Sequence, residues 1–309
     1  MAVKRARIAG LCLSVLILLF ALHLAIGENA PFAFAVIGDT GCGCSSQQEV
    51  AQRMIQWHRE KPFSVVLMTG DNIYARDHKT KGGSRALFQE RFDRYYGPLI
   101  EQGVKFYAVL GNHDMEANKG LDEILDKERF HILGRQGYYW FSPDHAVNGE
   151  SLISFYALNS VRLTEGEDTD QVAWLGKELA DQKSLWRIAF FHHPIHTPPG
   201  KHEVEVVFRT GIEKILVAAG VQATFAGHNH FYARMKPRDG IIHFVSGGGG
   251  RTLKTPEKDE FTAAAAKVHH FLYLEVLEEK MDFWAVPTSG PPFDHGTLLR
   301  KPVEAAELN

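Results

Sequence analysis

The chain has 309 residues, of which 45% are hydrophobic and 23% are charged. This balance is typical of a globular protein and excludes a disordered, collagen-like or coiled-coil architecture for most of the chain. A net charge of −3 argues against a broadly basic protein that binds nucleic acid, and three cysteines are too few to staple a small fold together.

The N-terminal segment predicts export. Lys4, Arg5 and Arg7 precede a nearly unbroken apolar run over residues 8–26. Positive charges, an apolar run and then small residues follow one another in this order in secretory signal peptides. The run is also long enough to span a bilayer, so residues 1–27 are either a cleaved signal peptide or a retained membrane anchor. We expect the rest of the chain to be secreted or periplasmic, or to be anchored facing outward, with membrane contact only if the segment is retained.

Strand and helix patterns alternate through the rest of the chain. Apolar runs predict strands over residues 32–37, 64–68, 105–110, 138–141, 152–158, 186–191, 223–226, 230–235, 241–246, 270–277 and 281–286. Amphipathic stretches predict helices over residues 46–60, 85–101, 170–181 and 204–219. This alternation indicates an α/β fold whose strands are buried on both faces. We expect one domain over residues 28–300, an irregular polar stretch at 251–267, and a disordered tail over 301–309.

Polar side chains that can bind a metal follow five of the predicted strands. They are Asp39, Asp71, Asn112, His192, His228 and His230. Because ligands gather at the carboxyl ends of parallel strands, we expect these side chains to meet at one edge of the fold. Oxygen and imidazole donors suit hard or borderline cations, and two ions about 3.5–4 Å apart can hold both oxygens of a phosphoryl transfer. The set predicts a two-metal site in which Asp71 bridges the ions.

Each of these residues also has an ordinary structural interpretation. A Gly-Asp pair at the end of a strand is commonly a plain turn. His192 and His193 could be loop histidines, and His228 and His230 could form a polar pair on one strand face, because alternate residues of a strand share a face. The recurrence of such residues after buried strands favours the metal site.

Five sequence blocks resemble the signature of the calcineurin-like metallophosphoesterases. They are Gly38-Asp39-x-Gly41, Gly70-Asp71-x-x-Tyr74, Gly111-Asn112-His113-Asp114, the segment at His192 and Gly227-His228-x-His230. Tyr74 makes the second block similar to that of the purple acid phosphatases. The resemblance covers about residues 32–287 and implies a four-layer α/β/β/α sandwich. The short segment before Asp39 makes the layout similar to the small, tartrate-resistant type.

The resemblance implies a dinuclear centre with one Fe(III) ion and one divalent Fe, Zn or Mn ion. The ferric ligands would be Asp39, Asp71, Tyr74 and His230, and the ligands of the divalent ion would be Asp71, Asn112, His192 and His228. His113 would protonate the leaving oxygen, and His202 would contact the phosphate. No role follows from the sequence for Cys42 and Cys44, although export would allow them to pair.

The implied activity is that of an exported acid phosphatase. It would hydrolyse phosphate monoesters through a metal-bound hydroxide, acting on small phosphorylated substrates, with phosphoproteins as a second substrate class. Two alternatives stay open. One is a metallophosphodiesterase on the same fold, and the other is an exported binding protein whose site is not catalytic.

Overall fold

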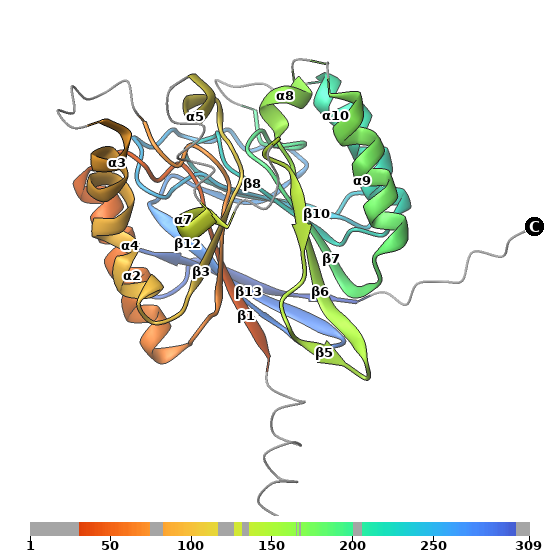
Figure 1. Ribbon diagram of the computed structural model, residues 1–309, viewed down its shortest axis with the longest axis horizontal. Coiled ribbons are helices and arrows are strands. Elements are labelled where there is room, and N and C mark those ends of the chain that lie inside the picture. Colours follow the sequence, from red (N-terminus) through yellow and green to blue (C-terminus); the bar gives the residue numbers. More distant parts are fainter. Residues whose placement is uncertain are drawn as a thin grey trace, which may run out of the picture.

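Two β-sheets face each other, and helices cover their outer faces (Figure 1). The computed structural model describes residues 31–74, 83–116, 127–131, 136–164, 166, 168–199 and 206–300. This arrangement confirms the expected four-layer α/β/β/α sandwich. None of the helices within these ranges is long and apolar enough to cross a membrane. The predicted signal peptide or anchor and the predicted disordered tail lie outside the described residues.

The first sheet has six strands in the order β14-β13-β12-β1-β2-β3. Their bounds are β1 (Phe32–Ile37), β2 (Val65–Met68), β3 (Lys105–Ala108), β12 (His270–Val276), β13 (Lys280–Pro287) and β14 (Asp294–Leu299). Strands β1, β2 and β3 are parallel, and β12 pairs with β1 in the antiparallel sense. The helices on its outer side are α2 (Ser45–Glu60), α3 (Gly83–Phe88), the π-helical turn η2 (Gln89–Asp93) and α4 (Arg94–Ile100).

The second sheet has the strand order β11-β9-β10-β8-β7-β6-β4, and β5 pairs with β6. The bounds are β4 (Tyr139–Phe141), β5 (Ala146–Val147), β6 (Glu150–Ala157), β7 (Ser184–Phe190), β8 (Ala223–Ala226), β9 (Tyr232–Met235), β10 (Ile242–Ser246) and β11 (Thr262–Ala266). Strands β6, β7, β8 and β10 are parallel. Five more helices lie within the described residues, namely α5 (Asn112–Glu116), α7 (Lys127–Phe130), α8 (Ser160–Thr164), α9 (Thr169–Asp181) and α10 (Val206–Ala218).

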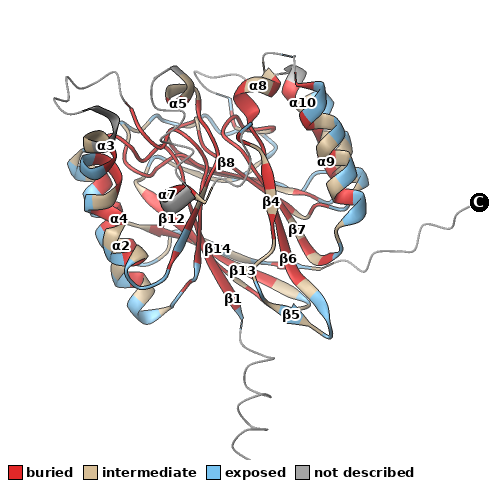
Figure 2. Cartoon of the chain, in the orientation of Figure 1, coloured by how far each residue is buried: buried red, intermediate tan, exposed pale blue. Residues whose placement is uncertain are grey.

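Aromatic side chains fill the space between the two sheets. Phe34 on β1 is fully buried and makes edge contacts with Phe155 on β6 and Phe225 on β8, at centroid distances of 5.1 and 6.0 Å. Because every residue of β1 is buried, its sequence is a continuous apolar run rather than an alternating one. Figure 2 shows the buried strands between helices whose outer faces are exposed.

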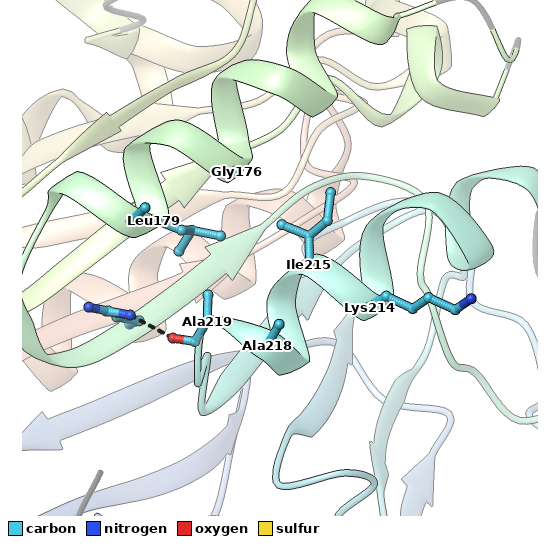
Figure 3. A pocket seen from close by; sticks show the side chains of 8 residues that line it. Gly176, Leu179, Lys214, Ile215, Ala218 and Ala219 are labelled. Atoms are coloured by element: carbon cyan, nitrogen blue, oxygen red, sulfur yellow. Dashed lines mark hydrogen bonds between the residues drawn. The ribbon is translucent and has the colours of Figure 1, made fainter. Parts of the chain in front are cut away.

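Helices α9 and α10 lie side by side on the outer face of the second sheet and border an open cavity of about 530 Å³ (Figure 3). Gly176 and Leu179 line it from α9, and Ile215 and Ala218 line it from α10. At one end Arg187 Nη1 donates a hydrogen bond to the Ala219 carbonyl at 2.6 Å. The cavity is mostly apolar, as expected where two amphipathic helices meet.

Three strands differ from the expectation. The two-residue strand β5, which pairs with β6, was not predicted, and the other two lie at the edge of a sheet. Strand β11 falls within the stretch predicted to be irregular, and it is built almost wholly from alanine, which has a low preference for strands. Strand β14 was not predicted, because Gly296 and alternating polar residues replace an apolar run on a half-exposed strand. The helix expected over 85–101 is present, with a π turn inserted at Gln89–Asp93.

Candidate metal centre

The loops after five parallel strands gather the predicted ligands at the carboxyl ends of the two sheets. The first sheet supplies the oxygen donors, from the loops after β1, β2 and β3, and the second supplies the imidazoles, from the loops after β7 and β8. The predicted ligands brought together are Asp39, Asp71, Tyr74, Asn112, His192, His228 and His230. The predicted phosphate contact, His202, lies outside the described residues.

Asp39, Tyr74 and His230 form one group. The Tyr74 hydroxyl donates to Asp39 Oδ1 at 3.2 Å and lies 3.4 Å from His230 Nε2. His230 Nε2 is 3.3 Å from the same carboxylate oxygen. A phenol, a carboxylate and an imidazole therefore converge on one spot, and this donor set suits a hard or borderline cation.

Asn112, His192 and His228 form a second group. Asn112 Oδ1 lies 3.1 Å from His192 Nε2 and 3.2 Å from His228 Nδ1. The two ring nitrogens are 3.2 Å apart. An amide oxygen and neutral imidazole nitrogens offer lone pairs, so three of them this close suit a shared cation.

Asp71 lies between the two groups. Its Oδ1 is 3.4 Å from His192 Nε2 in the second group. In the first group, ligand atoms of Asp71, Asp39 and His230 all lie within 4.8 Å of one another. A bridging carboxylate needs this position, and bridging itself stays a prediction.

Backbone carbonyls orient two of the imidazoles. His192 Nδ1 lies 2.9 Å from the Thr69 carbonyl, and His230 Nδ1 lies 3.0 Å from the Thr252 carbonyl. A carbonyl can only accept, so each Nδ1 carries a proton, and Nε2 is the nitrogen that each ring can offer to a cation. The same fixing of the tautomer is found behind metal-ligating histidines generally.

Three of the predicted ligands have a left-handed backbone. The φ angles of Asp39, Asp71 and His228 are 58°, 51° and 65°. This conformation is uncommon for residues other than glycine, and such strain costs of order 1–3 kcal/mol. Its presence at three loops of one site supports a functional constraint on where these side chains point.

Two neighbouring glycines leave room for the ligands. Gly70 has φ of +90°, and a Cβ on it would lie 2.6 Å from His192 Nδ1. A Cβ on Gly111 would lie 2.2 Å from Asp71 Oδ1. No side chain fits at either position without displacing a predicted ligand.

The charges in this centre fit a pair of cations. Burial, followed by the charge of Asp39, raises the pKa of Asp71 to about 7. Burial and the same two carboxylates raise the pKa of Tyr74 well above its usual value. Two carboxylates and a phenol are thus buried so close together that they cannot all carry a negative charge unless cations are present. Multivalent cations would remove this conflict and reverse both shifts.

Comparison with known proteins agrees with this geometry. Residues 32–232 match the family described as calcineurin-like phosphoesterase. The chain belongs to this family. The calcineurin-like phosphoesterases hold dinuclear metal sites, and the clusters described above are candidates for such a site in this member.

Its relatives include acid phosphatases. Purple acid phosphatase 7 of Arabidopsis thaliana is 24% identical over 300 residues, which cover 89% of this chain and 88% of the relative. Tartrate-resistant acid phosphatase type 5 of Oryctolagus cuniculus is 22% identical over 311 residues, covering 88% of this chain and 94% of the relative. The chain spans about half the length of several longer purple acid phosphatases.

Two solved structures share the fold. Purple acid phosphatase PPD1 from yellow lupin matches with a TM-score of 0.71 at 17% identity, over 89% of this chain and 55% of that chain. GAP50, the anchor in the inner membrane complex of Plasmodium, matches with a TM-score of 0.74 at 16% identity, over 88% and 90%. Likeness at these identities shows the fold alone, and a fold does not decide function.

The two groups of predicted ligands, together with Asp71, form the candidate phosphoesterase centre. His113 lies beside it. Its ring centroid is 4.7 Å from that of Tyr74, and its backbone N–H donates to Asp71 Oδ1 at 3.0 Å. The side chain is half-buried at the start of α5. This position is compatible with the predicted proton donor, whose role stays a prediction.

Asp114 supports the ligand loops, a role that the sequence did not reveal. One carboxylate oxygen accepts from the Gly111 N–H at 2.8 Å and from the Asn72 side chain at 2.9 Å. The other accepts from the Ile73 N–H at 3.0 Å. Asp114 thereby ties the loop after β3 to the loop after β2. Its place in the Gly-Asn-His-Asp block was the only signal.

His193 and Arg251 also line the phosphoesterase centre. The ring centroid of His193 is 4.5 Å from that of His228, and His193 Nδ1 lies 3.1 Å from Ser160 Oγ. The guanidinium carbon of Arg251 lies 4.5 Å from the centroid of the Tyr74 ring. Sequence reasoning left His193 as a loop histidine and missed Arg251, which follows a glycine run far along the chain.

Cys42 and Cys44 form a disulfide in the loop between β1 and α2. The buried Arg91 holds the same loop, because its Nη1 donates to the carbonyls of Gly41 and Cys42 at 3.1 and 2.5 Å. The bond and the arginine together fix the segment that follows Asp39. The pairing, which the sequence left open, is present.

Proposed function

We propose that this chain is an exported acid phosphatase that hydrolyses phosphate monoesters at a dinuclear metal centre. The observation that carries the proposal is the convergence of two groups of metal-binding side chains on Asp71. Tyr74 lies within the first group, which favours the purple type. The acid phosphatases among the relatives support the same activity.

The residues present fit one trivalent and one divalent ion. Asp39, Tyr74 and His230 would hold Fe(III), since phenolate and carboxylate oxygens are hard donors. The second group would hold divalent Fe, Zn or Mn, with Asp71 shared between the ions. When bound, such ions lower the pKa of water and offset the charge on phosphate oxygens.

Residues of the chain itself would donate the proton to the leaving oxygen and hold the ligand loops in place. The His113 imidazole would give a proton to the leaving oxygen, a task that suits histidine in mildly acidic solution. Asp114 would keep Asp71 and Asn112 in place through its hydrogen bonds to the two ligand loops. His202 stays the predicted phosphate contact.

Export is part of the proposal and rests on two observations. The order of charges and apolar residues at the N-terminus is that of a signal peptide or anchor. The disulfide between Cys42 and Cys44 favours an oxidising compartment, because disulfides are rare in the cytosol. The proposed substrates are small phosphate monoesters, with phosphoproteins as a second class.

A comparison of substrates tests the function. Purified protein loaded with iron and zinc should hydrolyse nitrophenyl phosphate faster than bis-nitrophenyl phosphate, and Asp71→Asn should abolish both reactions. Preference for the diester would favour the phosphodiesterase alternative. No hydrolysis of either ester by metal-loaded protein would favour a binding protein, as the anchor role of GAP50 shows for the same fold.

A further inference from the structure

A second cluster of metal-binding side chains lies outside the phosphoesterase centre. His196, Glu213 and His243 each offer one ligand atom, and these atoms all lie within 4.8 Å of one another. They come from the loop after β7, from α10 and from β10. These elements are far apart in sequence, so only the folded sheet brings the three side chains together.

His243 has a ring nitrogen without a hydrogen-bond partner. Its side chain is buried on β10, with 2% of the residue exposed. Nδ1 lies 2.8 Å from Thr224 Oγ1, but Nε2 has no partner among the described residues. Buried polar atoms nearly always have a hydrogen-bond partner or a bound ion, so the lack of one at His243 Nε2 indicates a place where a ligand can bind. Burial lowers the pKa of His243 to about 3, which leaves the ring neutral and able to offer a lone pair.

His196 and Glu213 complete the set. His196 Nε2 is 2.5 Å from Glu213 Oε1, and their side chains are only 11% and 20% exposed. The His196 ring centroid is 4.8 Å from that of His243. Two imidazoles and one carboxylate are a known ligand set for Zn²⁺, which then keeps a fourth position open.

An adjoining cavity gives an ion access to this cluster. His196 and His243 line a cavity of about 360 Å³ together with Arg209, Arg238 and Asp259. Lys236 lines the cavity as well, so its basic side chains outnumber Asp259, and the negative charge among the three metal-binding side chains comes from Glu213. A cation there would have three protein ligands and an open position facing the cavity.

We propose that His196, Glu213 and His243 form a third metal site that binds a divalent cation of the zinc class. The site is distinct from the phosphoesterase centre, and the proposal does not depend on hydrolysis. Binding would replace the hydrogen bond between His196 Nε2 and Glu213 Oε1, because both atoms would then bind the ion.

The third site is tied to the phosphoesterase centre by one loop. His196 follows His192 on the segment after β7. The next residue, Thr197, accepts a hydrogen bond at Oγ1 from Asn229 Nδ2 at 2.9 Å. Asn229 stands between His228 and His230, so an ion at the third site would also steady this loop.

Counting bound zinc tests the proposal. Protein depleted of metal and then dialysed against Zn²⁺ should bind one more equivalent in the wild type than in His243→Ala. Because His243 is buried and this variant can fail to fold, Glu213→Gln is the second variant. It keeps the side-chain size on a half-buried helix position, and it should lose the same equivalent.

A matched control removes an exposed histidine instead. His295→Ala on β14 should bind as much zinc as the wild type. Zinc should also raise the melting temperature of the wild type more than that of Glu213→Gln, because binding to the folded state stabilises it. Equal zinc content and equal thermal response in wild type and Glu213→Gln would overturn the proposal.

Discussion

The proposed purple type of phosphatase depends on Tyr74. Its phenol oxygen lies within reach of Asp39 and His230, so it can bind the same ion. Tyr74→Phe keeps the ring against Arg251 and His113 and removes only that oxygen. We expect the iron-loaded variant to lose the violet phenolate-to-iron band and to retain iron less well. Visible absorption and iron analysis measure this. An unchanged band in the Phe variant would show that Tyr74 is not a ligand.

Asp71 is expected to bind both ions, because it lies between the two groups of ligands. Asp71→Asn keeps the shape and removes the charge that two cations would share. We expect this variant to lose most of the metal at the centre and nearly all activity. Metal analysis by mass spectrometry checks the outcome, and full occupancy of both ions would rule out bridging.

His113 is expected to act on the leaving group, so its effect should depend on the substrate. His113→Ala should lower turnover of alkyl phosphates by about 10²–10⁴-fold, as for the loss of a general acid. The loss should be smaller for nitrophenyl phosphate, whose leaving group needs no proton. Metal content serves as the control and should not change. Equal losses for the two substrates would point to another role.

At the scale of elements, the sequence predicted the strands and helices whose own residues show a clear apolar or amphipathic pattern. Strand β1 is an unbroken apolar run, and α2 buries Val50, Met54 and Trp57 on one face. Edge strands β11 and β14 carry weak signals, because half-exposed strands need few apolar residues. Their place becomes clear only from pairing with β9 and β13.

The same limit applies to the sites. Six of the predicted ligands could be selected because each follows a strand of the parallel core, whereas Tyr74 was selected by the family resemblance. The cluster of His196, Glu213 and His243 was not predicted, because it depends on the loop after β7, α10 and β10 meeting in space. The support from Asp114 depends likewise on two loops meeting in space.

A substitution in the loop after β3 tests how closely this loop packs against the loop after β2. In Gly111→Ala the new Cβ would collide with Asp71, at 2.2 Å from Oδ1 and 2.3 Å from the backbone nitrogen. We expect the variant to fold but to lose metal and most activity. Gly176→Ala on α9 is the matched control, since nothing lies within 4 Å of its Cβ beside the cavity of Figure 3.

That control should be neutral or should stabilise the helix by roughly 1 kcal/mol, because alanine favours helices over glycine. Metal content and thermal unfolding of the two variants distinguish a local collision from a general effect of alanine. Full metal binding by Gly111→Ala would show that the two loops are not closely packed.

At the scale of the whole molecule, a buried histidine predicts how stability changes with pH. His270 on β12 is fully buried between Tyr232 and Phe293, and burial lowers its pKa to about 4. The unfolded chain binds a proton at this residue below pH about 6.5, whereas the folded chain does not. The contribution of His270 to stability should therefore be complete above that pH and should be lost as the pH drops toward 4.

The contribution of His270 to this loss is on the order of 3 kcal/mol, because each pKa unit corresponds to about 1.4 kcal/mol. His270→Gln removes the titration, so its stability should change less over the same range. Denaturant unfolding of both proteins at several pH values measures the difference. Parallel curves for the two proteins would show that His270 is not buried in its neutral form.

Metal content and phosphate release, measured on one sample before and after chelation, test the central claim most directly. We expect the purified protein to contain iron and a second metal ion at its centre and to hydrolyse a phosphate monoester. Chelation should remove metal and activity together, and reloading should restore both. Monoester hydrolysis that persists in metal-free protein, or its absence from fully loaded protein, would contradict a dinuclear phosphatase.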